Sequence, residues 1–150
     1  MTKNTAINFH NAGEDSETHQ APCHQGHTPD DRIGTYVAII GSPDFPNLDL
    51  VRRFVESLSA ATTIVSRGVE CGLDRCTAAA ARARGLHVIE YLPQSDLHGC
   101  DAGHFRDEQI VQCSHRIIIF WSGPSPDTRF AASLAYELGV PVDIRFPDSL

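Results

Sequence analysis

The chain has 150 residues, a formal net charge of −7 and a sequence pI of about 5.5, which fit one ordinary domain with a tail. The net negative charge argues against a protein that binds the phosphate backbone of nucleic acids, because such a protein carries a stripe of basic residues on its surface. The longest apolar run, residues 117–121, is far shorter than the roughly 20 residues of a membrane-spanning helix, so we expect no membrane partner.

Residues 1–33 are polar and show no helical or strand-like apolar period, which predicts a disordered polar tail before a folded domain at 34–150. The tail places potential zinc or copper ligands close together, but their spacing matches no standard metal-binding motif. We therefore predict no metal site and no cofactor. These potential ligands are His19, Cys23, His24 and His27.

From Thr35 onward, short apolar runs alternate with helical patterns. This alternation predicts an α/β domain, Rossmann-like and three-layered, with a mostly parallel five-stranded sheet. Asn47 and Asp127 are the expected N-caps of the helices at 47–60 and 127–139, while Gly85 and Gly139 end the helices at 73–85 and 127–139. The strands are expected at 35–41, 62–66, 87–93, 115–121 and 142–146, the helices at 47–60, 73–85, 105–114 and 127–139, and a loop at 94–104.

Small and polar residues follow three of the expected strands, at 41–45, 67–74 and 122–128. In an open parallel sheet, ligands bind outside the carboxyl ends of the strands. Glycine allows close backbone approach, and the free amides of a following helix attract anions. The three segments together predict a pocket for a nucleotide-sized ligand that carries phosphate.

The segments VAIIGSPDF, GVECGLDRCTAAAARARGLHV and IIIFWSGPSPDTRFAASLAYELGVPV, with two shorter ones, resemble the YspA/cpYpsA-related branch of the SLOG superfamily over residues 35–145. That superfamily also holds the DNA-processing proteins of natural transformation and the "lonely guy" cytokinin-activating phosphoribohydrolases. The resemblance implies a Rossmann-like domain that binds nucleotides or nucleotide-derived molecules and associates as a homodimer or higher homo-oligomer.

The family's G-S-R-D-F, G-x-x-x-G-x-D, R-N and W-x-G-x-S-x-G-T elements fall on four segments of this chain. Together with the residues next to them, they predict the ligand contacts. These are Gly41, Ser42, Asp44, Phe45, Arg67, Gly68, Cys71, Gly72, Asp74, Arg106, Asp107, Ser122, Gly123, Ser125, Asp127 and Thr128.

The chain departs from the family's elements at four positions, where two arginines are replaced and two acids are gained. Pro43 and Cys71 stand where arginine is usual, Asp107 replaces asparagine, and Asp127 replaces glycine. These changes weaken the expectation of a polyphosphate ligand. The arginines that remain as partners for an anion are Arg67, Arg75, Arg106 and Arg129.

A catalytic role is uncertain from the sequence. The phosphoribohydrolases carry a catalytic glutamate where this chain has Ala131, and alanine cannot donate or accept a proton. Glu70 is the best candidate for a displaced catalytic carboxylate, against the simpler interpretation of a solvated loop acid. Asp44 and Asp127 are better explained as a turn former and a helix cap.

Other reactive residues have simpler explanations. The five cysteines form no disulfide pattern and the chain begins without an apolar signal segment, so we expect reduced thiols and a cytoplasmic protein. Cys71 and Cys76 fit small, partly buried thiols better than nucleophiles, and His98 and His104 fit a polar loop better than a metal site. Trp121 fits either stacking on a base or core packing.

The sequence therefore predicts binding, for sensing or sequestration, of a nucleotide or nucleotide-derived small molecule. A nucleotide N-glycosidase or phosphoribohydrolase is the alternative. Single-stranded DNA binding is the third hypothesis and is disfavoured by the acidic charge.

Overall fold

The computed structural model describes residues 34–69 and 72–148, so the tail predicted at 1–33, together with Glu70 and Cys71, lies outside the described residues. The described chain forms a five-stranded sheet in the order β3-β2-β1-β4-β5, and every neighbouring pair of strands is parallel. The predicted fold class is confirmed. The strands are β1 (Thr35–Gly41), β2 (Thr62–Ser66), β3 (His87–Glu90), β4 (Arg116–Phe120) and β5 (Val142–Arg145).

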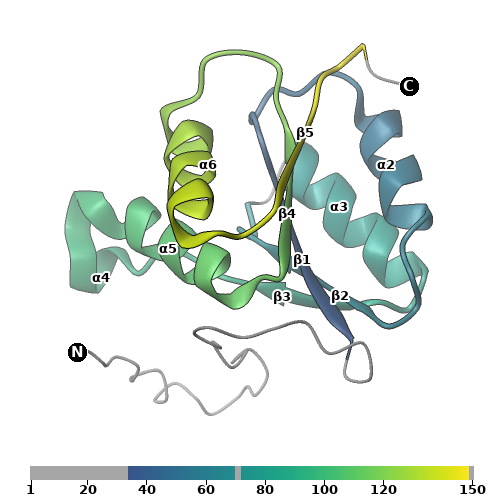
Figure 1. Ribbon diagram of the computed structural model, residues 1–150, viewed down its shortest axis with the longest axis horizontal. Coiled ribbons are helices and arrows are strands. Elements are labelled where there is room, and N and C mark those ends of the chain that lie inside the picture. Colours follow the sequence, from purple (N-terminus) through teal and green to yellow (C-terminus); the bar gives the residue numbers. More distant parts are fainter. Residues whose placement is uncertain (1–33, 70–71, 149–150) are drawn as a thin grey trace.

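Helices cover both faces of the sheet, and this gives the three layers seen in Figure 1. Helices α2 (Leu48–Glu56) and α3 (Gly72–Ala83) pack on one face, while α5 (Ala102–Cys113) and α6 (Pro126–Leu138) pack on the other. A short helix α4 (Ser95–His98) and a 3₁₀ turn (Gly99–Asp101) connect β3 to α5.

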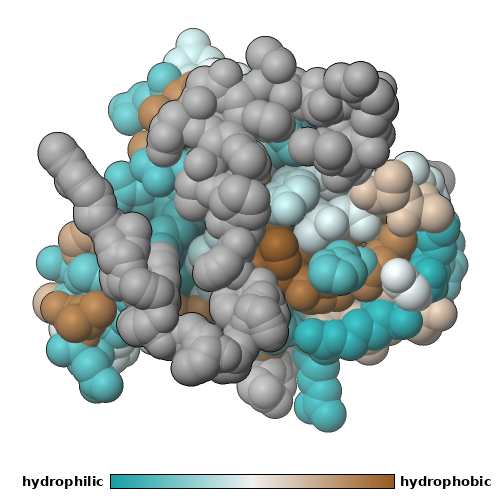
Figure 2. All heavy atoms as spheres, turned by 90° about the horizontal axis from the view of Figure 1, so that it is seen from below, coloured by the Kyte–Doolittle hydropathy of each residue, from teal (hydrophilic) through white to brown (hydrophobic). Residues whose placement is uncertain are grey.

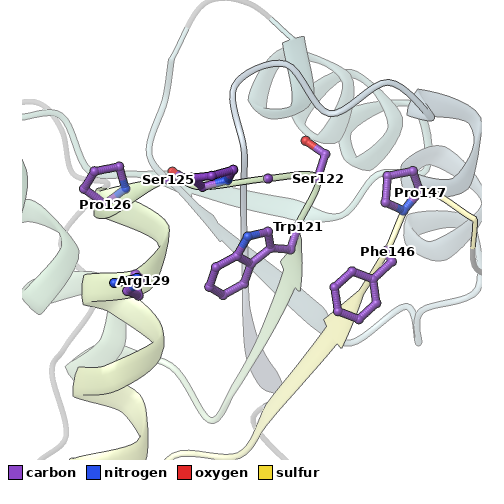
Figure 3. A pocket seen from close by; sticks show the side chains of 9 residues that line it. Trp121, Ser122, Ser125, Pro126, Arg129, Phe146 and Pro147 are labelled. Atoms are coloured by element: carbon purple, nitrogen blue, oxygen red, sulfur yellow. The ribbon is translucent and has the colours of Figure 1, made fainter.

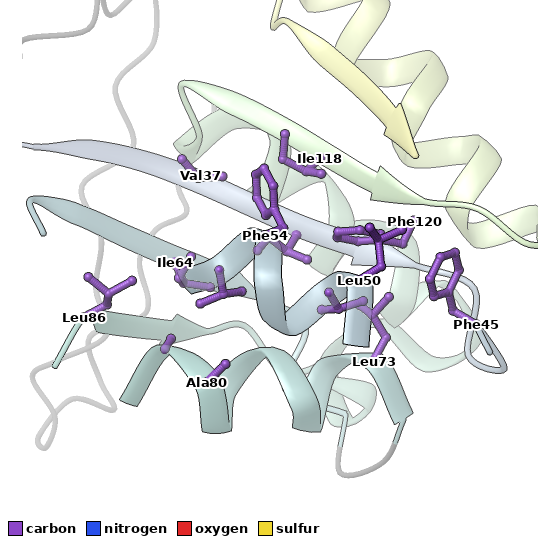
Figure 4. Packing of buried hydrophobic residues seen from close by; sticks show 14 residues of the cluster. Val37, Phe45, Leu50, Phe54, Ile64, Leu73, Ala80, Leu86, Ile118 and Phe120 are labelled. Carbon is purple, nitrogen blue, oxygen red and sulfur yellow. The ribbon is translucent and has the colours of Figure 1, made fainter. Parts of the chain in front are cut away.

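Strand β1 has apolar side chains on both faces of the sheet, because successive side chains point in opposite directions. Helices must therefore pack on both faces to bury them. Val37 and Ile39 pack against α2 and α3, and Ala38 and Ile40 pack against α5 and α6. Figure 4 shows the first of these clusters, in which Phe120 of β4 meets the rings of Phe45 and Phe54. The ring centroids lie 5.4 and 6.0 Å apart and the rings meet edge to face.

The helix ends follow the predicted chemistry with one exception. Asn47 caps α2 by accepting a hydrogen bond from the Leu50 amide, and Gly139 ends α6 with φ of 76°. The prediction that Asp127 caps α6 is wrong. Ser125 is the N-cap, its hydroxyl accepts from the Thr128 amide, and Pro126 takes the first helical position.

The boundaries differ from the prediction mainly between β3 and β4. Residues 94–104, expected to be a loop, contain α4, the 3₁₀ turn and the start of α5, which begins three residues earlier than predicted. Strand β3 ends at Glu90, although the apolar pattern continues to Pro93. The side chain of Leu92 is largely exposed, which is why the pattern did not mark the end of the strand.

The described surface mixes hydrophilic and hydrophobic residues. Figure 2 shows this mixture on the face seen from below, where teal side chains border a brown area at the right of the view. Several large apolar side chains are exposed, among them Leu97 and Tyr136. Within residues 34–69 and 72–148, no helix is long and apolar enough to cross a membrane.

Candidate ligand-binding site

The order of the strands places a topological switch point between β1 and β4. Strands β2 and β3 follow on one side of β1, whereas β4 and β5 lie on the other. Gly41 and Phe120 are register partners, so the two loops that leave these strands start side by side. Ligands of open α/β sheets bind at this position.

Ser42 joins the two loops at the switch point. Its amide donates to the Phe120 carbonyl at 3.0 Å, and its hydroxyl accepts from the Ser122 amide at 3.1 Å. The Ser122 hydroxyl lies 3.4 Å from Oδ1 of Asp44, which is exposed. Phe45, predicted as a ligand contact, is instead buried in the core against Phe120.

The glycines of the first two loops are needed for contacts inside the protein. A β-carbon at Gly41 would lie 2.6 Å from Cδ1 of Leu73 in α3. Gly72 has φ of +57°, and a β-carbon there would lie 2.6 Å from the Pro43 carbonyl oxygen. The loop 41–45 therefore touches the start of α3 at Gly72 and Leu73, and the glycines that predicted close approach to a ligand allow this contact inside the protein.

A buried charged cluster lies beside the end of β2. Asp107 in α5 is fully buried, and its Oδ1 accepts from Nε of Arg67 at 3.1 Å and from Nε of Arg106 at 2.9 Å. Its Oδ2 accepts from Nη2 of Arg67 at 3.0 Å. The Asp107 carboxylate thus accepts hydrogen bonds from two buried arginines. It binds Arg67 through two nitrogens and Arg106 through one.

Asp74 borders this cluster from the first turn of α3. It is 7% exposed, and its Oδ2 accepts from the Val69 amide at 3.3 Å. Burial raises the pKa of Asp74 to about 6, although Arg67, the Val69 amide and Arg106 act in the opposite direction. With this pKa, Asp74 is about half-protonated at pH 6 and roughly one-tenth protonated at pH 7, so it can give or take a proton close to neutral pH.

Arg106 has donors that the described protein does not use. Its Nε is bonded to Asp107, but within residues 34–69 and 72–148 its two terminal nitrogens make no hydrogen bond. The residue is only 7% exposed. Gly103 leaves room beside these nitrogens, since a β-carbon there would lie 3.6 Å from Nη2. Neither nitrogen is among the described buried side-chain atoms that lack a partner, so both reach the surface of the cluster and are open to an anion from solvent.

The N-terminus of α6 forms the third part of the predicted site. The hydroxyl of Ser125 also bonds Oγ1 of Thr128 at 2.9 Å, and Thr128 is fully buried. Asp127 is exposed and lies 4.0 Å from His104. Ala131 is fully buried in the core beneath the sheet, so no carboxylate is available at the position of the phosphoribohydrolases' glutamate.

A pocket of about 580 Å³ lies on the other side of the loop that follows β4. The loop residues Ser122, Gly123 and Ser125, all predicted contacts, form part of its wall. Figure 3 shows the indole of Trp121 in this pocket, between Arg129 of α6 and the ring of Phe146. Phe146 and Pro147 were missed by the sequence analysis, although both follow the end of β5 and so reach the same edge of the sheet.

His98, His104 and Cys76 have structural partners. His98 stacks on Phe105 and His104 stacks on Phe130, with ring centroids 3.9 and 4.2 Å apart. Burial raises the pKa of the Cys76 thiol, which keeps it protonated, and its Sγ lies 3.6 Å from the Leu48 carbonyl. In the described part of the chain, no three His, Cys, Asp or Glu side chains are placed to hold a metal ion.

No protein-family model matches the chain, and no curated protein is significantly similar to it. Among solved structures, DNA processing protein A from Helicobacter pylori, described with a unique single-stranded DNA binding mode, is 18% identical. The match covers 78% of this chain and 69% of that one, with a TM-score of 0.56, and it shows a shared fold. The C-terminal domain of the PF1911 hydrogenase from Pyrococcus furiosus is 16% identical over 81% of this chain and 98% of its own length, with a TM-score of 0.44.

The structure brings the three predicted loops to one edge of the sheet and separates their residues by role. Ser42, Gly41, Gly68 and Gly72 shape the loops, and Phe45 and Thr128 are buried. Asp44, Ser122 and Asp127 are exposed, and Gly123 and Ser125 are half-buried. Arg67, Asp74, Arg106 and Asp107 form the charged cluster, while Glu70 and Cys71 lie outside the described residues.

Proposed function

We propose that the chain binds a nucleotide or nucleotide-derived small molecule at the carboxyl edge of its sheet. The observation that carries the proposal is Arg106, whose side chain is mostly covered by the protein while its terminal N–H groups reach the surface and make no hydrogen bond to the described residues. Such a guanidinium suits a phosphate or another anion, which offers several acceptor oxygens at once. Its place beside the end of β2, near the switch point, is where ligands of this architecture bind.

The motifs support the same ligand class. The resemblance to the SLOG superfamily and the shared fold with DNA processing protein A agree with a nucleotide-type ligand. Asp107 takes part of the charge of both Arg67 and Arg106, and Asp74 lies close to both. The net positive charge of the cluster is therefore small. We propose that a ligand with one phosphate group binds at this position in preference to a polyphosphate.

Equilibrium dialysis against AMP, ADP, ADP-ribose and a cyclic dinucleotide tests the proposal. We expect binding of at least one of them, weakened about tenfold or more by Arg106→Met, because a hydrogen bond to a charged group contributes about 1.5–3 kcal/mol. The variant leaves Arg67 and Asp107 as a balanced pair, so it retains the fold. Arg82→Met removes an exposed arginine from the last turn of α3 and is the control. No binding of any of the four compounds would refute the proposal.

N-glycosidic hydrolysis is a second candidate function, and Asp74 is the observation that favours it. A buried carboxyl with a pKa of about 6 at a ligand-binding edge suits a general acid. Chromatography of AMP after incubation with the protein would reveal free adenine. Loss of that product in Asp74→Asn would support hydrolysis, whereas no product at high protein concentration would exclude it for this substrate.

Single-stranded DNA binding is the third candidate, suggested by the neighbour that binds it. The formal charge of −7 opposes it. A gel-shift experiment with single-stranded DNA, repeated at rising salt, decides this point. Tight retention that weakens steeply with salt would favour DNA over a small nucleotide.

A further inference from the structure

The pocket beside Trp121 shares Ser122, Gly123 and Ser125 with the predicted ligand contacts, but its other walls are different. The loop 121–126 forms one wall, Arg129 of α6 forms the second, and Phe146 with Pro147 forms the third. Arg129 was predicted as a partner for an anion, whereas Phe146 and Pro147 were not predicted at all, and Arg106 is not part of the lining. Figure 3 shows these three walls around the indole ring. The residues that line this pocket therefore differ from those of the charged cluster around Arg106.

Flat apolar surfaces dominate this lining. Trp121 is half-buried and packs partly against the core formed with α5 and α6, which fixes the indole in place. Phe146 is 54% exposed and faces the pocket from the opposite wall. Pro124, Pro126 and Pro147 add rigid apolar edges. A planar ring gains most from such walls, because it can stack on an aromatic face that is already immobilised.

The charge of the pocket is opposite to that of the whole chain. Arg129 is the charged side chain among its described lining residues, and none of those residues is acidic. Within residues 34–69 and 72–148, Arg129 makes no side-chain hydrogen bond or ion pair, whereas Arg52, Arg53, Arg82 and Arg145 all pair with acids. In a chain of formal charge −7, this gives the pocket a local preference for an anion.

We infer that this pocket is a second binding site, separate from the Arg106 site, for a planar aromatic ring that carries one anionic group. The ring lies against Trp121 and Phe146, and the anionic group faces Arg129. The pocket volume of about 580 Å³ falls within the usual range for small-molecule sites, roughly 300–1,000 Å³. A nucleoside monophosphate and a simple aryl phosphate share this chemistry, and the experiment distinguishes them.

Tryptophan fluorescence reads this site directly, because Trp121 is the single tryptophan of the chain. We expect AMP to quench the emission saturably, since a stacked base is in contact with the indole. Adenosine lacks the anion and should bind at least fivefold more weakly, while ribose 5-phosphate lacks the ring and should leave the emission unchanged. Phenyl phosphate quenching as well as AMP would assign the site to aryl anions in general, and quenching by AMP alone would assign it to nucleotides.

Two variants test the two halves of the inference. Arg129→Ala should weaken AMP at least fivefold and leave adenosine unchanged, and Phe146→Ala should weaken AMP and adenosine alike, by about tenfold, which is the usual scale of a lost stacking partner. Arg53→Ala removes an exposed arginine of α2 and should change neither affinity.

The inference fails if neither AMP nor phenyl phosphate quenches Trp121, if adenosine binds as well as AMP, or if ribose 5-phosphate quenches equally. Its failure is distinct from failure of the proposed function. Binding by dialysis that depends on Arg106, without a change in Trp121 emission, would support the nucleotide site and refute this one. Quenching that depends on Arg129 but not on Arg106 would support this site alone.

Discussion

Replacing Asp107 by asparagine should be among the most damaging single changes in the described part of the protein. The aspartate is fully buried and is bonded to Arg67 and Arg106 through three hydrogen bonds of 2.9–3.1 Å. An asparagine oxygen can replace Oδ1, but its amide nitrogen then faces the donor Nη2 of Arg67. Both guanidinium groups lose their counter-charge. Removing one partner of a buried ion pair costs about 3–5 kcal/mol of unfolding free energy.

Urea unfolding at neutral pH measures this loss. For an m-value of about 2 kcal/mol per molar urea, the midpoint should fall by about 1.5–2.5 M at unchanged m. The matched control is Glu56→Gln, which removes an acid lying 4.0 Å from Arg52 in an exposed pair. It should cost no more than about 0.5 kcal/mol.

A triple variant separates charge from packing. Arg67→Met, Arg106→Met and Asp107→Leu together remove the cluster and leave side chains of similar volume, so most of the lost stability should return. The reasoning is refuted if Asp107→Asn alone costs less than about 1 kcal/mol, because the carboxylate would then not be balancing two buried cations.

Three further changes test the site and its loops. Because the pKa of Asp74 is raised to about 6 from 3.8, its protonated form stabilises the fold fully below pH 3.8, and this stability is lost as pH rises through 6. The unfolding free energy of the wild type minus that of Asp74→Asn should therefore fall by about 2–3 kcal/mol between pH 4 and 7 in urea titrations, and a flat difference would contradict the raised pKa. Gly72→Ala should cost at least about 1 kcal/mol more than Gly85→Ala in thermal unfolding, since both have positive φ but only the first meets a carbonyl oxygen. Ser125→Ala should cost about 1 kcal/mol and Asp127→Ala less, because Ser125 is the cap of α6; the reverse order in urea unfolding would restore Asp127 to that role.

The alternation of apolar runs and helical patterns predicted all five strands and the four long helices. This worked because strands buried on both faces are nearly continuous apolar runs, such as residues 37–40 and 117–120. The short helix α4 was not predicted because Leu97 is the one large apolar residue in 94–101 and is itself exposed, so no face of the segment carries an apolar period.

The sequence contains a signal that identifies the true N-cap of α6. Ser125 and Asp127 are both good capping residues, and the proline between them decides the choice, since proline favours the first helical position and so follows the cap. By contrast, nothing in the sequence pairs Arg67 with Asp107, which lie 40 residues apart. The topology rule brought the loops together, but only side-chain packing determines which charges meet.

The sequence predicted only part of the pocket beside Trp121. Its loop wall falls in the third predicted segment, whereas Phe146 follows a fifth strand whose end was not considered as part of the edge. In a parallel sheet, every strand end reaches that edge, so each of them is worth inspection.

The two-to-one arrangement of the buried arginines and Asp107 also constrains how this sequence can change over time. Loss of either arginine alone leaves one cation facing one anion, whereas loss of the aspartate alone leaves two cations without a counter-charge. Substitutions at the three positions should therefore occur in a preferred order, in which an arginine changes first and Asp107 last. Among descendants of this sequence, an arginine pair without an acid at position 107 is the combination that selection should remove.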